Sequence, residues 1–224
     1  MKLTKTDFIH YLKCPESLWL LKNRPEEYPK GEFSLFIKKL IKDGYEVEEF
    51  AQQLFPEAIQ LHSFGTTHDT QVALYQKRKF FLQATFETKN GVFSRIDVLE
   101  RLSNNKWHIY EVKSSNEVST KKKHNHILDA CFQKFVLQEN GLEVSKVSII
   151  HLNRDYIKYN TINVNDLLVI ADITEMVNNE YSGVVNQINA ASTLINKSVI
   201  DTPTCSCLRK TRNNHCDSFT GLKN

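Results

Sequence analysis

The chain has 224 residues and a formal net charge of +3, from 29 lysines and arginines against 26 aspartates and glutamates. This length suits about one domain with extensions, and so small a basic excess does not by itself identify a nucleic-acid binder. No apolar run approaches membrane-spanning length and no apolar segment follows a basic start, so we expect neither export nor a bilayer, and a cytoplasmic protein.

Apolar residues are dense from Leu3 to Asn23, which predicts a short helix followed by a second helical piece. Cys14-Pro15 interrupts them, and proline suits the first turn of a new helix. We therefore expect Cys14 at a helix start, half exposed, where its thiolate could reach a partner. Taken alone, such a cysteine is more often an inert core residue.

Residues 33–55 predict one long helix that Pro56 ends. Its expected buried stripe comprises Phe36, Leu40, Ile41, Val47, Phe50, Ala51 and Leu54. Gly44 within it suggests close approach to another element. Glu46 and Glu49 share one face and Glu48 is offset from them, but charged helical residues are usually solvated, so the helix alone assigns them no role.

Three consecutive antiparallel strands follow a stretch, 57–76, that is expected to form only short strands or loop. The strands span residues 80–87, 92–101 and 107–112. Asn90-Gly91 predicts the first hairpin turn, and a polar turn at 103–106 leads into the third strand.

Two of these strands bring charged residues together. Strand alternation places Asp97, Glu111 and Lys113 on one face, and Ile96, Val98, Tyr110 and Val112 on the other. Two carboxylates beside an ammonium suit a divalent cation between the acids and a lysine that orients or activates water, which is nuclease chemistry. Each residue taken alone is more simply a solvated group on an exposed sheet face.

Beyond Lys113, a helix is predicted from about 123 to 140, with Gln133 on it and Gly141 ending it. The apolar residues of 144–152 predict a strand buried on both faces. A helical crossover between strands joins parallel neighbours. The basic run Lys121-Lys122-Lys123 could contact a phosphate backbone, or be only a solvated loop.

Residues 165–196 predict a mostly helical region with a break near Gly183. Five cysteines form an odd count, and three of them gather near the end of the chain as Cys205, Cys207 and Cys216. In a reducing compartment this cluster indicates metal or cluster binding rather than disulfides. Cys131 lies among apolar residues and is read as packing.

Taken in order, the acidic helix, the Asp97 strand, the Glu111-Val112-Lys113 strand and the glutamine-bearing helix resemble the PD-(D/E)XK nuclease superfamily. More narrowly, the chain resembles RecB-like iron–sulfur nucleases, including CRISPR-associated exonucleases and the AddB-type nuclease domain. The resemblance implies an α/β, restriction-endonuclease-like core: a mixed central sheet flanked by helices, with N- and C-terminal segments joined at a cysteine-ligated cluster. It covers 1–224 as a single domain: a Cys14-bearing helical segment (1–30), the nuclease core (33–152), a helical segment (164–197) and the cysteine segment (203–217).

The resemblance also implies site residues. Asp97 and Glu111 would hold Mg²⁺ or Mn²⁺, with Lys113 near the attacking water and Gln133 as the motif glutamine. Leu137 stands where the family commonly has a tyrosine. The acidic helix lacks the family's histidine, so Glu46 is the first choice of ligand there and Glu49 the second.

The cysteine pattern implies a [4Fe–4S] cluster on Cys14, Cys205, Cys207 and Cys216. Cys205-Ser206-Cys207 is tighter than the usual spacing, so a structural Zn²⁺ site, with His215 able to replace one sulfur, stays an alternative. We expect a metal-dependent DNA nuclease, an exonuclease on single-stranded ends. The alternatives are a catalytically inactive nucleic-acid-binding module of the same fold, and a structural cluster-binding domain of a larger protein.

Overall fold

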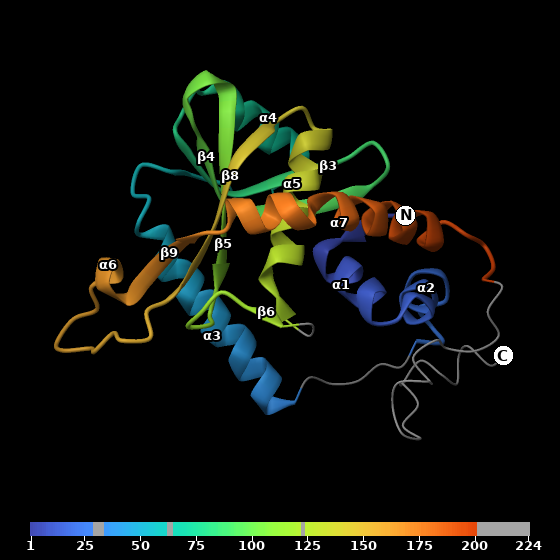
Figure 1. Cartoon of the computed structure of the whole chain (residues 1–224), viewed down its shortest axis with the longest axis horizontal. Helices are drawn as coiled ribbons and strands as arrows, with labels where there is room; N and C mark the ends of the chain where they lie inside the picture. Colours follow the sequence, from blue (N-terminus) through green and yellow to red (C-terminus); the bar gives the residue numbers. More distant parts are fainter. Residues whose placement is uncertain (29–33, 62–64, 122–123, 201–224) are drawn as a thin grey trace.

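The structure is a computed structural model, and it describes residues 1–28, 34–61, 65–121 and 124–200. It shows an α/β protein with a mixed central sheet flanked by helices (Figure 1). Five predicted site residues lie outside the described residues: Lys122, Lys123, Cys205, Cys207 and Cys216. The strands of the main sheet run in the order β2-β3-β4-β5-β8-β9, and β1 also pairs with β4. They comprise β1 (Leu3–Thr4), β2 (Ile59–Gln60), β3 (Phe80–Glu87), β4 (Val92–Arg101), β5 (Lys106–Lys113), β8 (Glu143–Leu152) and β9 (Leu168–Asp172).

The centre of the sheet confirms two predictions. β3, β4 and β5 are consecutive antiparallel strands, and β5 pairs in parallel with β8. The crossover between β5 and β8 contains α5 (His126–Glu139), which the small ribbon of β6 (Thr120–Lys121) and β7 (His124–Asn125) precedes. The hairpin turn requires glycine at position 91, because φ is 78° there and a Cβ would lie 2.8 Å from the Met1 carbonyl oxygen.

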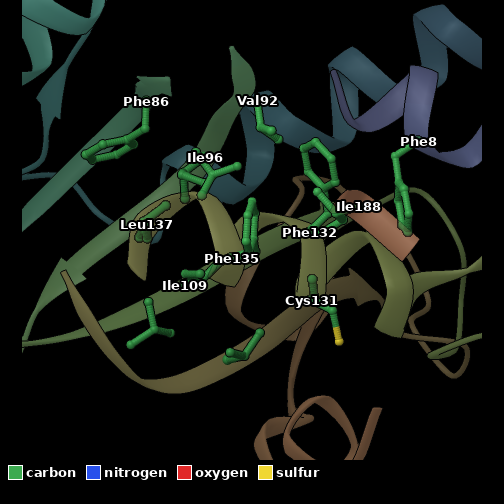
Figure 2. Close-up of a cluster of buried hydrophobic side chains, with 14 of the residues drawn as sticks. Phe8, Phe86, Val92, Ile96, Ile109, Cys131, Phe132, Phe135, Leu137 and Ile188 are labelled. Carbon is green, nitrogen blue, oxygen red and sulfur yellow. The ribbon is translucent and has the colours of Figure 1, made fainter. Parts of the chain in front are cut away.

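Helices cover both faces of the sheet. α5 packs with α1 (Lys5–Lys13) and α7 (Thr174–Ile195) over one face, where Phe8 of α1 stacks on Phe132 of α5 at 5.4 Å between centroids (Figures 1 and 2). A second core forms on the other face, where α3 (Leu35–Gln52) places Val47 and Ala51 against Leu82, Val98, Tyr110 and Ile150. The remaining helices are α2 (Pro15–Asn23), α4 (Thr67–Tyr75), α6 (Val164–Leu167) and the short η1 (Ser103–Asn105).

The predicted buried stripe of α3 is wrong in its N-terminal half. Phe36, Leu40 and Ile41 are exposed, because this half of the helix runs beyond the sheet (Figure 1) and only the C-terminal half packs on it. The predicted close approach at Gly44 is wrong as well, since a Cβ there would meet no atom of the described residues within 4 Å.

Two further elements differ from expectation. Residues 57–76 contain the helix α4, whose first turn Thr66 and Asp69 close with a reciprocal capping box. Within 165–196, Leu168–Asp172 form the edge strand β9, because β8 offers them an antiparallel partner. Gly183 then lies inside an unbroken α7, so the predicted break is wrong.

The start of the chain and the end of α7 lie together. Trp19 Nε1 donates to the Lys197 carbonyl oxygen at 2.8 Å, and Asn23 Nδ2 donates to the Ile195 carbonyl oxygen at 3.2 Å. The described chain therefore leaves α7 beside α2. Among the described residues, no helix has the length and apolar character needed to cross a membrane.

Candidate active site

The predicted acidic residues meet where two strands diverge from β4. β5 pairs with β4 only from Val98 to Arg101, whereas β1 pairs with it at Val92 and Phe93. β3 pairs with one edge of β4, including Phe93, so β1 and β5 must both lie along the other edge of β4. Residues 94–97 of that edge have neither strand as a neighbour; this gap, with Asp97 at its β5 end, is called the fork below.

A local kink turns Asp97 into the fork. Ile96 packs in the core under α5 and Val98 in the core under α3, so the predicted placement of both on one face is wrong. The cause lies opposite, where Gln83 of β3 has a left-handed backbone (φ 60°) and interrupts the alternation of both strands. Asp97 Oδ2 instead accepts a hydrogen bond from the Val112 N–H at 2.8 Å.

Glu111 is the buried centre of the site. Its side chain is 2% exposed and is bound by Lys113 Nζ, at 2.8 Å from Oε1, by Lys5 Nζ and by Gln133 Nε2. Lys113 Nζ also lies 2.5 Å from Asp129 Oδ2. The structure thus brings together Asp97, Glu111, Lys113 and Gln133, as predicted, and adds Lys5 and Asp129.

The pKa values of the two acids are shifted in opposite directions. Burial, followed by the negative charge of Glu111, raises the pKa of Asp97 to about 7. Burial of Glu111 opposes its ionisation, but the ammonium groups of Lys113 and Lys5 hold the pKa of Glu111 below its usual range. Near neutral pH, therefore, Glu111 is ionised while Asp97 is divided between its two forms.

Both lysines stay charged. Burial disfavours their ammonium forms, but the carboxylates around them, Glu111 foremost, raise the pKa of Lys113 and of Lys5 above the usual value. Neither lysine can therefore take up a proton at neutral pH. Each acts as a fixed positive charge and a hydrogen-bond donor.

The acidic helix contributes Glu48 rather than Glu46 or Glu49. Glu48 Oε1 accepts a hydrogen bond from Gln83 Nε2, and burial raises its pKa, with Arg95 opposing and Glu111 adding to the rise. Glu46 is exposed, 3.6 Å from Lys42, and Glu49 is exposed too. Glu48 neighbours the buried Val47 and lies one turn before the buried Ala51. These positions indicated that Glu48 faces the sheet, but the buried stripe predicted for the whole helix obscured this.

The carboxylates of the site suit a magnesium-like ion that takes only one or two of its ligands from the protein. The described part of the chain contains no group of three or more His, Cys, Asp or Glu side chains placed to hold a metal. Mg²⁺, however, is commonly bound through one or two carboxylates, with water and phosphate oxygens completing the set. Asp97 and Glu111 could supply these two hard ligands, and the buried Gln133 Oε1 has no hydrogen-bond partner among the described residues.

The two described cysteines have different surroundings. Cys14 is 5% exposed, contrary to the half exposure expected; it lies at the start of α2 with Pro15 next, and its Sγ is 3.4 Å from Glu16 Oε2. Cys131 is buried in the core, where its Sγ donates to the Val177 carbonyl oxygen at 3.5 Å (Figure 2). Burial raises the pKa of Cys131 to about 12, and its packing role is confirmed.

Lys121, the described member of the basic run, is exposed and lies 3.5 Å from Glu117. None of its hydrogen bonds or ion pairs to the described residues involves an acid of the fork. Asp129 and Lys5 belong to the site but were not predicted from the sequence. The position of Asp129, one helical turn before Gln133, could have indicated that it faces the site. Nothing in the sequence indicated Lys5, because the pairing of β1 with β4 brings it to a partner 106 positions away.

No family model matches the chain, and no curated protein matches it. Among solved structures, the chain is similar to one titled "Crystal structure of SSO0001", with a TM-score of 0.39 and 12% sequence identity over 88% of this chain and 77% of that chain.

Proposed function

We propose that the protein is a metal-dependent nuclease that hydrolyses phosphodiester bonds in DNA and acts on single-stranded ends. The observation that carries this proposal is the pairing of the partly buried Asp97, whose pKa is about 7, with the ionised Glu111 and the charged Lys113. Strongly perturbed acids beside a fixed cation are typical of catalytic sites rather than of solvated sheet surfaces.

Asp97 and Glu111 would hold Mg²⁺ or Mn²⁺, and Glu48 is the carboxylate of the acidic helix whose charge acts on Asp97. The bound ion would supply charge stabilisation at the phosphoryl group and at the attacking and leaving oxygens. Gln133 donates to Glu111 and fixes its orientation, so that the carboxylate is already in place before an ion arrives.

Lys113 has a role that follows from its charge. Because its pKa is raised, it cannot remove the proton of an attacking water; it can orient that water and offset the charge that develops on the phosphate. Asp129 holds the Lys113 ammonium from the other side, at 2.5 Å, and so limits its freedom. Lys5 provides a second fixed positive charge next to Glu111.

We also propose a [4Fe–4S] cluster that joins the two ends of the chain, on Cys14, Cys205, Cys207 and Cys216. Two observations support it. Cys14 begins α2, where the helix dipole favours a thiolate. The described chain ends beside the same helix, and Cys205 follows the last described residue, Ile200, by five positions in the sequence. A structural Zn²⁺ site with the same sulfurs is the competing occupant.

One observation also fits a module that binds nucleic acid without cutting it: Glu111 is already neutralised by two ammonium groups. Cleavage of end-labelled single-stranded DNA in Mn²⁺ separates the two functions. We expect Lys113→Ala to slow cleavage about 100-fold or more, and Lys158→Ala, an exposed lysine on the loop after β8, to leave the rate unchanged. Binding without cleavage by the wild type would favour the inactive module, and neither binding nor cleavage would favour a structural domain.

A further inference from the structure

We infer that a groove along α1 binds the single DNA strand adjacent to the bond that is cut, with Tyr28 stacking on one base. This inference rests on the proposed function and names the surface and the residues that would bind its single-stranded substrate. The groove has a volume of about 450 Å³, and Lys5 and Asp129 line it. Both residues also belong to the ion-pair network around Glu111 and Lys113, so the groove adjoins the candidate active site.

The charge of the groove suits a phosphate backbone. Lys5, Ile9 and Lys13 recur every four residues, so they form one face of α1 along about 12 Å. The Lys5 side chain is 28% exposed although it binds Glu111, and Lys13 is exposed without an ion pair to any described residue. The two ammonium groups can therefore contact phosphates of different nucleotides.

The groove also contains an oriented aromatic ring. Tyr28 is half-buried and makes an edge contact with His10, with ring centroids 5.9 Å apart and planes at 67°. His10 is held in turn by Ser17, 2.8 Å from its Nε2 to Oγ. Burial, and then the nearby Lys13, lower the pKa of His10, so this ring is neutral at physiological pH and serves to position Tyr28.

An aromatic ring beside spaced cations is the usual means of holding a single strand, because unpaired bases stack on the ring while the cations follow the backbone. A duplex already stacks its bases on one another and offers no free base face to Tyr28. Hence the groove predicts a preference for single-stranded DNA that does not depend on the metal.

Binding in EDTA tests this inference apart from cleavage. Fluorescein-labelled dT10 is titrated with wild type, Lys13→Ala, Tyr28→Ala and Tyr28→Phe, with Lys158→Ala as the matched lysine control and a thermal melt to verify folding. We expect Kd to rise about fivefold or more for Lys13→Ala and Tyr28→Ala and to stay within twofold for Tyr28→Phe and Lys158→Ala. A blunt duplex should bind at least about fivefold more weakly than dT10.

Unchanged Kd values for Lys13→Ala and Tyr28→Ala, equal affinity for the duplex, or no binding of dT10 by the wild type would each overturn the groove assignment. The two proposals fail separately. If the expected binding pattern holds but no metal supports cleavage, only the nuclease proposal fails; if wild type cleaves and the two groove variants bind and cleave as it does, only the groove proposal fails.

Discussion

The backbone N–H of Val112 donates to Asp97 Oδ2 at 2.8 Å, at the point where β4 and β5 stop pairing. A carboxylate thus takes the place of a strand carbonyl as the acceptor for β5. One hydrogen bond is little compensation for a partly buried negative charge next to Glu111, and this imbalance raises the pKa of Asp97. In the metal-free site the ionised form of Asp97 is therefore electrostatically unfavourable, and a bound cation would stabilise it.

The first prediction concerns stability of the metal-free protein. The pKa of Asp97 rises from its ordinary 3.8 to about 7 on folding, so the folded state holds a proton that the unfolded chain has lost, and Asp97 lowers stability progressively from about pH 4 to pH 7. In EDTA at pH 8, Asp97→Asn should raise the free energy of unfolding by about 2–4 kcal/mol, with little gain at pH 4. Urea unfolding at both pH values measures this.

Asp155→Asn is the control, because Asp155 is exposed on the loop after β8. It should change stability little at either pH. An Asp97→Asn protein that is no more stable than wild type at pH 8 would contradict the burial argument for this carboxyl.

The second prediction concerns metal affinity. A cation must displace the Asp97 proton, so the Mg²⁺ concentration that half-saturates the thermal stabilisation should rise about tenfold for each pH unit below 7 and level off above it. Thermal melts across Mg²⁺ titrations at pH 6, 7 and 8 provide the measurement. A midpoint independent of pH would mean that Asp97 does not bind the ion.

The third prediction separates the glutamates of α3. Glu48→Gln should slow cleavage about tenfold or more, because Glu48 lies within electrostatic reach of Asp97 and accepts from Gln83. Glu46→Gln, two positions earlier on the same helix, should leave the rate within twofold, since Glu46 is exposed and its ion pair among the described residues is with Lys42. Initial rates under equal Mn²⁺ test the pair, and the reverse order of effects would restore Glu46 as the ligand.

The fourth prediction concerns the cysteines. Anaerobically purified wild type should be brown, with broad absorption near ~400 nm and stoichiometric iron and sulfide. Cys14→Ser should lose the colour, whereas Cys131→Ala should keep it, because Cys131 packs in the core beside Val177. Colourless protein with one equivalent of zinc would replace the iron–sulfur proposal with a structural zinc site.

Local chemistry was enough to predict the centre of the fold. Asn90-Gly91 marked the β3–β4 hairpin, and the crossover from Lys113 through α5 to β8 made those strands parallel. The charged residues of β4 and β5 likewise indicated Asp97, Glu111 and Lys113 as one group.

The features of the site that could not be predicted from the sequence depend on packing between residues far apart in the chain. Gln83 adopts a positive φ although it is not glycine, so no residue pattern announced the kink that turns Asp97 into the fork. The side of α3 that packs on the sheet, and hence the choice of Glu48, depends on how far the helix overlaps β5. Lys5 reaches Glu111 only because β1 pairs with β4.

Metal-dependent cleavage compared between wild type and Asp97→Asn tests the central claim most directly. Single-turnover degradation of end-labelled single-stranded DNA is measured in Mg²⁺, in Mn²⁺ and with EDTA. The proposal predicts cleavage with either ion, none with EDTA, and a loss of about 100-fold or more in a folded Asp97→Asn protein. Cleavage that persists in EDTA, or that Asp97→Asn performs at the wild-type rate, would contradict it.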